Sequence, residues 1–248
     1  MMGIERQSAL TENTLYELCN RNGSGRRINK RKPYVLALIT SHLIGMEPGL
    51  SYLRDLSNAQ MMLRISAEDE LFSHFSLQEL VNLIGNDDWI LQRELSEMII
   101  NQVDIIFLPI LSFSLVSDIL SYNDRRLLVR IILKAILSGK KVIGLRLGAD
   151  PYHPIWRMKG MDKGPQILKR KLQEQLQGLK SLGIKLIDTN EKIDFTFEKA
   201  YKKSIITEKT IRYVHQNNQS FLFISNETIL TPLAKDLARE LKISLITE

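Results

Sequence analysis

The stretch DIIFLPILSFSLVSDIL, residues 104–120, decides the fold. Four apolar residues follow Asp104, then come Pro109 and the run LSFS (111–114), after which a helical apolar pattern begins. A short continuous apolar run that ends at a turn is typical of a strand covered on both faces. The stretch therefore predicts a buried strand that passes through a serine-containing turn into a helix.

Strands and helices alternate on both sides of this stretch. The apolar runs predict strands at 34–40, 60–65, 103–108, 141–147 and 184–187. Helical spacing of apolar residues predicts helices at 49–57, 77–83, 89–100, 125–137 and 169–182. Strands joined by helices of this length predict a parallel sheet with right-handed crossovers. We expect an α/β fold, a doubly wound and mostly parallel sheet with helices on both faces.

The bulk composition is that of a globular protein. Of the 248 residues, 44% are hydrophobic and 25% are charged, which is ordinary for a soluble chain. The longest apolar runs are far too short to span a bilayer, and the polar N-terminus lacks the apolar core of a secretory signal. A single cysteine, Cys19, excludes an internal disulfide framework. We expect a soluble cytoplasmic protein without a membrane partner.

The positive charge is concentrated at the N-terminus. Residues 1–33 hold seven basic and three acidic side chains, which gives +4 of the total net charge of +6. Such a tract suits either an acidic partner or a solvated linker. No aromatic residue interleaves 26–32, as base stacking would require, so a nucleic-acid partner is not expected.

A short helix is predicted just before the basic tract. Thr11 or Asn13 can cap it, and Leu15, Leu18 and Cys19 follow at helical spacing. The run Asn-Gly-Ser-Gly at 22–25 ends it as a flexible linker. The apolar stripe of this helix must be buried either on the parent domain or in a partner, and the sequence leaves both open.

Hydroxyl groups cluster at the predicted strand ends. Ser41 and His42 follow the first strand, Ser66 follows the second, and the 109–114 turn follows the middle one. The carboxyl ends of parallel strands share one edge of the sheet, where ligands bind. Hydroxyls and free N–H groups there suit a phosphate, although ordinary helix capping by serine explains any one of them. No glycine-rich phosphate fingerprint follows a strand, which argues against NAD and ATP.

From about residue 34 to 187 the order of these elements resembles the flavoprotein family that includes phosphopantothenoylcysteine decarboxylase, whose fold is flavodoxin- or Rossmann-like. The family's turn P-A-[ST]-A-N-T corresponds to PILSFS (109–114), and GKKVIGLRLGADPYHPIW (139–156) resembles its G-K-P-V-…-P-A-M-N-…-M-W stretch. The resemblance implies an FMN cofactor. It implies that the cofactor is contacted by six residues, which are Ser41, His42, Ser66, Ser112, Phe113 and Ser114.

The chain departs from the family at its catalytic positions. The stretch 95–103 has no histidine, Phe113 replaces the turn's Asn, and the cysteine lies in the tail. A decarboxylase without its base needs substitutes. His42 and His153 are weak candidates for catalysis, with Asp150 or Asp118 as carboxylate partners. No short-range ligand spacing supports a metal site.

The C-terminal part carries a second resemblance. Thr207 and Thr231-Pro232 begin two predicted helices around a strand at 221–224. The phrase ILTPLAKDLARELKISL (229–245) is similar to a segment of proteins from bacterial microcompartment operons for ethanolamine and propanediol utilization. We therefore divide the chain into a tail (1–33), an FMN-binding domain (34–190) and an appendage (191–248). The resemblance implies a location inside a microcompartment, with shell or cargo proteins binding the N-terminal helix.

The sequence leaves three functions open. The first is redox or electron-transfer support for a microcompartment pathway by a homo-oligomeric, trimer-based flavoprotein. The second is a non-redox adaptor or scaffold with a vestigial flavin site. The third is a lyase or decarboxylase with altered catalytic residues. Serines at the strand ends favour the first, and the missing Asn and His favour the second. Fold analogy alone does not choose between them.

Overall fold

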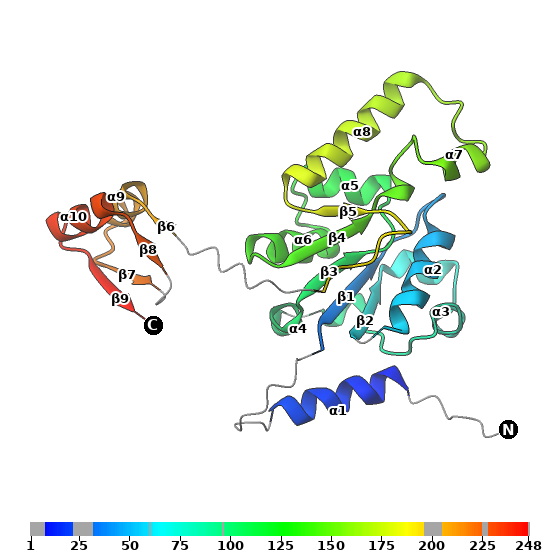
Figure 1. The fold of residues 1–248 in the computed structure, drawn as a ribbon, viewed down its shortest axis with the longest axis horizontal. Helices are drawn as coiled ribbons and strands as arrows, with labels where there is room; N and C mark the ends of the chain where they lie inside the picture. Colours follow the sequence, from blue (N-terminus) through cyan, green and yellow to red (C-terminus); the bar gives the residue numbers. More distant parts are fainter. Residues whose placement is uncertain are drawn as a thin grey trace. The chain divides into compact units, whose positions relative to one another are not determined.

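The structure, a computed structural model (Figure 1), describes residues 8–21, 32–59, 61–95, 97–195, 205–224 and 228–247. The chain divides into two compact units, Met1–Ile193 and Asp194–Glu248. Most of the basic tract and the 22–25 linker lie outside the described residues, as does residue 60 of the predicted second strand. No helix in the described ranges is long and apolar enough to cross a membrane.

A five-stranded sheet with the order β2-β1-β3-β4-β5 forms the first unit. Its strands are β1 (Tyr34–Ile39), β2 (Met62–Ala67), β3 (Ile105–Leu108), β4 (Lys141–Leu145) and β5 (Lys185–Ile187). Every neighbouring pair is parallel. The order reverses between β1 and β3, so the loops after these two strands flank the switch point where such sheets bind ligands. The predicted doubly wound parallel sheet is confirmed.

Helices cover both faces of this sheet (Figure 1). They are α2 (Met46–Ser57), α3 (Leu77–Ile84), α4 (Glu97–Gln102), α5 (Phe113–Leu120), α6 (Leu127–Leu137), α7 (Pro154–Met158) and α8 (Gln166–Ser181). Leu36 and Leu38 of β1 share one buried cluster with side chains of α4, α5, α6 and α8. On the other face Tyr52 of α2 packs against Phe107 of β3, with ring centroids 5.4 Å apart. Both faces are therefore apolar, as the continuous apolar strands predicted.

The helix predicted at 89–100 is wrong for most of its length. Trp89 forms an isolated parallel bridge with Ile65 of β2, and the Ile90 N–H donates to the Ile65 carbonyl at 2.9 Å. A short 3₁₀ turn, Gln92–Glu94, and the six-residue α4 follow. The extended chain pairs with the open edge of β2, because this pairing gives hydrogen-bond partners to backbone groups of the strand. The spacing of apolar side chains carries no information about such pairing.

The N-terminal helix α1 (Ala9–Arg21) packs on the first unit, but not with its predicted stripe. Leu15 and Leu18 are 57% and 52% exposed, whereas Asn13 is 7% exposed. The Asn13 amide donates to Asp88 at 2.7 Å, and Asp88 pairs with Arg64 at 2.9 Å. A buried polar network therefore fixes the face of the helix, since unpaired polar groups there cost more than exposed leucines.

The second unit contains two similar strand–helix–strand halves. The first half holds β6 (Ile205–Ile206), α9 (Glu208–Gln216) and β7 (Phe221–Ile224), and the second holds β8 (Ile229–Leu230), α10 (Pro232–Glu240) and β9 (Ser244–Thr247). Strand β6 pairs with β8 and β7 pairs with β9, both in parallel. The Thr231 hydroxyl accepts the Ala234 N–H at 3.3 Å, so the predicted cap of α10 is confirmed.

Candidate functional site

The turn after β3 begins α5 with a serine cap. The Ser112 side chain is buried, and its hydroxyl accepts the Leu115 N–H at 3.2 Å. The Ser114 hydroxyl lies 3.2 Å from that of Ser112, and Ser114 is exposed. Ser112 therefore holds the start of α5 in place, which is the capping role that the sequence left open.

Phe113 stands in a row of three aromatic rings. Its centroid lies 4.7 Å from that of His42, nearly perpendicular, and 5.8 Å from that of Trp156. The Trp156 indole N–H donates to the Leu147 carbonyl at 3.0 Å, which ties α7 to the loop after β4. The row joins the loops that follow β1, β3 and β4 at the carboxyl edge of the sheet.

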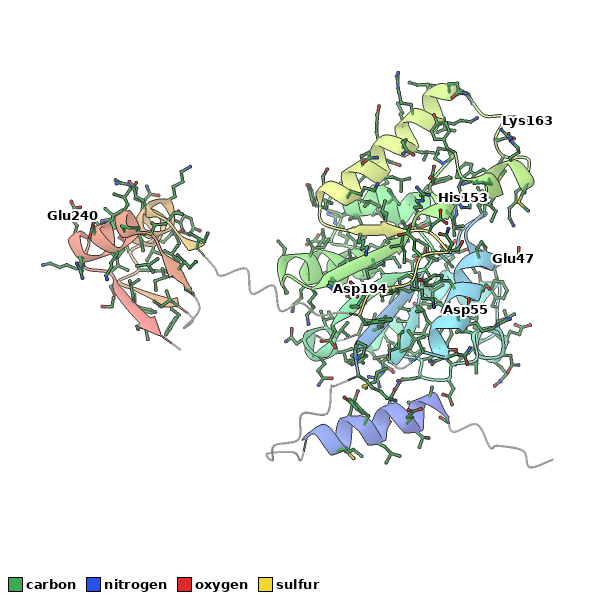
Figure 2. The ribbon with its side chains drawn as sticks, viewed as in Figure 1. Glu47, Asp55, His153, Lys163, Asp194 and Glu240 are labelled. Atoms are coloured by element: carbon green, nitrogen blue, oxygen red, sulfur yellow. The ribbon has the colours of Figure 1, made fainter. Side chains whose placement is uncertain are left out.

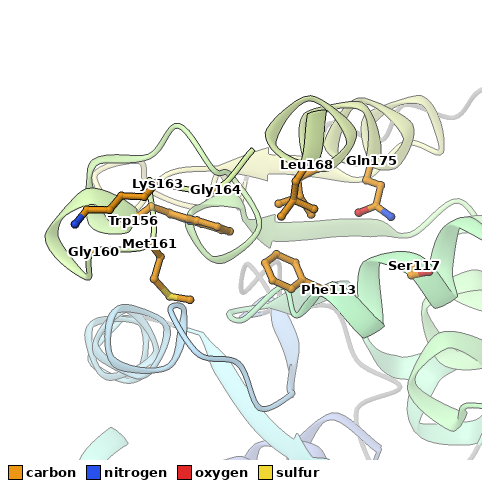
Figure 3. A pocket seen from close by; sticks show the side chains of 10 residues that line it. Phe113, Ser117, Trp156, Gly160, Met161, Lys163, Gly164, Leu168 and Gln175 are labelled. Carbon is orange, nitrogen blue, oxygen red and sulfur yellow. The ribbon is translucent and has the colours of Figure 1, made fainter. Parts of the chain in front are cut away.

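A cavity of about 590 Å³ opens beside this row (Figure 3). Phe113 and Ser117 of α5, Trp156 of α7, and Leu168 and Gln175 of α8 are among its walls. In Figure 3 the rings of Phe113 and Trp156 and the side chain of Leu168 surround the same space, and the Lys163 amino group points away from Phe113. This volume lies in the usual range for small-molecule and cofactor sites, and the walls are mainly apolar.

Backbone donors gather in the loop after β1 and at the start of α5, the helix that contributes Phe113 to the cavity wall. Within the described chain, the N–H groups of Ser41, His42 and Leu43 after β1 donate no hydrogen bond, and neither do those of Phe113 and Ser114 at the start of α5. The Thr40 hydroxyl donates to the Ile110 carbonyl at 3.1 Å and so fastens the two loops together. Free N–H groups at a helix start and in an adjoining loop suit an anion such as phosphate.

His42 has one nitrogen engaged and one without a partner. Nδ1 accepts the Ile44 N–H at 3.4 Å, whereas Nε2 is buried and has no hydrogen-bond partner among the described residues. Burial lowers the pKa of His42 below its ordinary value of 6.5, because the charged form is less well solvated there. The ring is therefore neutral near pH 7.

Ser66 lies in β2 itself, not in the loop that follows it. Its side chain is fully buried, and its hydroxyl has no partner among the described residues. Among the predicted hydroxyls, those of Ser66 and Ser112 are thus enclosed, while Ser41 is half-buried and Ser114 exposed. The residues at the accessible edge are those that follow β1 and those that begin α5.

His153 takes a different partner from the two that were predicted. It lies between β4 and α7 (Figure 2). It caps α7, where its Nδ1 accepts the Ile155 N–H at 3.3 Å. Its Nε2 lies 3.3 Å from Asp188 Oδ1, after β5, and the other Asp188 oxygen accepts from Arg146 at 2.8 Å. Both nitrogens of His153 are therefore engaged, which leaves neither free to move a proton to or from a ligand.

The surroundings of Asp188 favour its charged form. Burial by itself raises the pKa of Asp188, but hydrogen bonds from Arg146 and the Thr189 N–H outweigh burial and lower this pKa below its ordinary value. Asp188 was not singled out from the sequence. Its place directly after a predicted strand, at the same edge as the other loops, was the signal that could have found it.

Arg126 is a second residue that the sequence did not reveal. Its guanidinium donates to both oxygens of Glu68 at 2.7 and 2.8 Å, to Asp118 at 2.8 Å and to the Ser114 hydroxyl at 3.2 Å. Hydrogen bonds from Asn123 and Arg126 lower the pKa of Asp118. Asp118 thus forms an ion pair with Arg126. In the described chain it does not pair with His42 or His153, contrary to the prediction.

The described residues hold no group of three or more His, Cys, Asp or Glu side chains placed to bind a metal ion. His42 and His153 lie in separate surroundings, the first among aromatic rings and glycines, the second among Asp188 and Arg146.

No protein-family model and no curated protein matches this chain. Solved structures that resemble it include a dodecameric FMN-dependent Ubix-like decarboxylase from Escherichia coli O157:H7, at 12% identity over 74% of this chain and 94% of that one, with a TM-score of 0.44. A mutant PPC decarboxylase complexed with pantothenoylaminoethenethiol is 16% identical to this chain. The match covers 63% of this chain and 82% of that one, with a TM-score of 0.42. The FMN-dependent cysteine decarboxylase TvaF from thioviridamide biosynthesis is 11% identical to this chain. The match covers 62% of this chain and 89% of that one, with a TM-score of 0.42.

At these identities and TM-scores the likenesses carry no argument about what this chain binds. The fold and the cavity of this chain define its class: a doubly wound α/β protein with a cavity partly walled by aromatic side chains that follow the carboxyl ends of its strands.

Proposed function

We propose that this chain is an FMN-binding flavoprotein that acts on a small molecule held beside the flavin. The observation that carries the proposal is the cavity of about 590 Å³ whose walls include Phe113 and Trp156, at the edge where doubly wound sheets bind ligands. The sequence resemblance to the flavoprotein family supports the same cofactor. A planar tricyclic ring stacks favourably on aromatic side chains.

The residues present fit both halves of FMN. The aromatic walls suit the ring, and the unpaired N–H groups of the loop after β1 and of the start of α5 suit the phosphate. Ser41 and Ser114 have hydroxyls within these two segments, whereas Ser66 is fully buried near the end of β2. Arg126 pairs with Glu68 and Asp118 beside Ser114, and it offsets part of the negative charge that these carboxylates, together with Asp69 and Glu70, place at this end of α5.

Bound FMN would supply two-electron oxidation and reduction. The residues of this chain exclude water from the ring with apolar walls, orient it between aromatic side chains and supply neutral donors. Among the described residues, no carboxylate lines the cavity, which suits an uncharged ring. We assign no general-base role to His153, because both of its nitrogens have partners within the chain.

An enzyme of the decarboxylase or lyase type agrees better with this cavity than electron transfer to a protein partner does. Transfer between proteins needs an exposed ring edge, whereas walls contributed by α5, α7 and α8 suit a small substrate enclosed beside the ring. The chain lacks the family's Asn and upstream His, so its substrate and its proton donor differ from the family's. Homo-oligomerisation and a microcompartment location rest on resemblance alone and remain predictions.

The test is the visible absorption spectrum of the purified full chain with added FMN. We expect a bound-flavin spectrum near one FMN per chain, and about tenfold weaker binding in Phe113→Ala and Trp156→Ala, because each removes a stacking surface. Tyr213→Ala, which alters an exposed aromatic residue of the second unit, is the control and should bind normally. A chain that takes up no FMN would refute the proposal and leave the adaptor role as the explanation.

A further inference from the structure

His42 carries a hydrogen-bond donor for which the described residues supply no acceptor. Its Nδ1 accepts the Ile44 N–H at 3.4 Å, and a neutral imidazole with one accepting nitrogen carries its proton on the other. The proton is therefore on Nε2, which is buried and without a partner in the described chain. A buried donor of this kind is uncommon in native structures and calls for an acceptor from outside the chain.

The direction of this N–H is fixed by close packing around the ring. A Cβ atom built on Gly148 would lie 3.3 Å from Nδ1 of His42, and one built on Gly45 would lie 3.7 Å from it. On another side Phe113 contacts the ring nearly edge-on, with centroids 4.7 Å apart. The imidazole thus lies with Nδ1 beside two glycines and with its ring against Phe113, and the Ile44 N–H bond to Nδ1 leaves Nε2 as the nitrogen available to a ligand.

Phe113 connects this donor to the cavity. The Phe113 ring contacts His42 and also Trp156, and it forms part of the cavity wall. Phe113 is half-buried at the first position of α5, where its ring can turn more easily than a fully enclosed one. A ligand ring that stacks on Phe113 after the Phe113 ring has rotated can bring its polar edge next to Nε2.

We propose that His42 is a ligand-contacting residue whose Nε2–H donates a hydrogen bond to a carbonyl acceptor of the flavin ring. This inference rests on the proposed FMN function and deepens it by naming the donor. Reduction of a flavin increases the negative charge on the acceptors of its pyrimidine ring. A fixed, neutral donor in a site shielded from water therefore binds the reduced form more tightly than the oxidised form and raises the midpoint potential.

The experiment compares the wild-type chain with two substitutions at one position. His42→Phe keeps a planar ring and removes the donor, whereas His42→Gln keeps an N–H donor of similar reach. His153→Phe is the matched control, because both nitrogens of His153 are already engaged by Ile155 and Asp188. For each chain the dissociation constant of FMN and the midpoint potential of the bound flavin are measured.

We expect His42→Phe to lose about tenfold of its preference for reduced over oxidised flavin, which is about 30 mV for a two-electron couple. His42→Gln should retain most of this preference, and His153→Phe should retain all of it. In the wild type, the ¹⁵N signal of the His42 Nε2–H should shift when FMN is added. This measurement needs no variant, so a variant that fails to fold does not decide the question.

The possible failures are distinguishable. If the wild type binds FMN but His42→Phe has the same potential, or if the His42 Nε2 signal does not move, then the role of His42 is overturned and the flavin function stands. If the wild type binds no FMN, the proposed function and this inference fall together. A potential that falls equally in His42→Phe and His42→Gln would show that ring shape matters and the donor does not, which also overturns the inference.

Discussion

The two histidines at the carboxyl edge of the sheet have opposite surroundings. His42, after β1, lies among Gly45, Gly148 and Phe113 and keeps one nitrogen without a partner in the described chain. His153, after β4, uses both nitrogens, one to cap α7 and one beside Asp188. Both follow a strand, so a position at the strand end alone does not define a ligand-contacting residue. The two histidines differ in whether a carboxylate of the chain lies beside the second ring nitrogen, as Asp188 does for His153. We infer that this difference decides which histidine can bind a ligand.

The largest expected effect tests the close packing of α2, the helix that follows His42, against the turn after β3. A Cβ atom on Gly49 of α2 would lie 2.6 Å from the Pro109 carbonyl oxygen, which is backbone at the turn after β3. We expect Gly49→Val to lower the free energy of unfolding by about 3 kcal/mol, because backbone must shift to admit the side chain. Urea unfolding measures this. Gly164→Val, where a Cβ atom meets nothing within 4 Å, is the control and should stay within about 0.5 kcal/mol. Equal losses in the two variants would contradict the packing argument.

The next effect tests the interactions of the Asp188 carboxylate with Arg146 and His153. Asp188→Asn removes the charge that Arg146 and His153 share. The expected loss of stability is about 1 kcal/mol, because the partly buried partners lose a charge-assisted hydrogen bond, with FMN affinity unchanged. Asp162→Asn, which alters an exposed pair with Arg157, should cost less than about 0.5 kcal/mol. If Asp188→Asn instead abolished FMN binding, the division of roles between the two histidines would be wrong.

The smallest effect is the pH dependence of the His42 region. Burial lowers the pKa of His42 in the folded chain below its ordinary value of 6.5. Between these two pKa values the unfolded chain binds a proton that the folded chain does not, so stability is lost as the pH falls from 6.5 through the folded-state pKa. We expect the wild type to lose more stability than His42→Phe between pH 8 and pH 5 in urea unfolding. Identical pH profiles would show that burial does not hold His42 neutral.

Local signals predicted those parts of the fold that depend on neighbours in sequence. The continuous apolar run at β3 and the threonine cap of α10 were predicted, whereas the serine cap of α5 was left open as an alternative to a cofactor contact. Where a distant segment competes, the prediction failed. The segment at Trp89 lies extended beside β2 and is not helical, because the open strand edge offered hydrogen bonds that no local pattern indicates.

The sequence by itself determined the doubly wound class, most of the elements and the turn that bears Phe113. These follow from side-chain periodicity and capping, which act over a few residues. The tertiary structure alone decided that Asp188 pairs with His153, that Arg126 joins Glu68 to Ser114, and that Asn13 is buried while Leu15 is exposed. These contacts join residues far apart along the chain. Their partners are selected by which strand ends and helix faces meet, and that depends on the packing of the whole sheet.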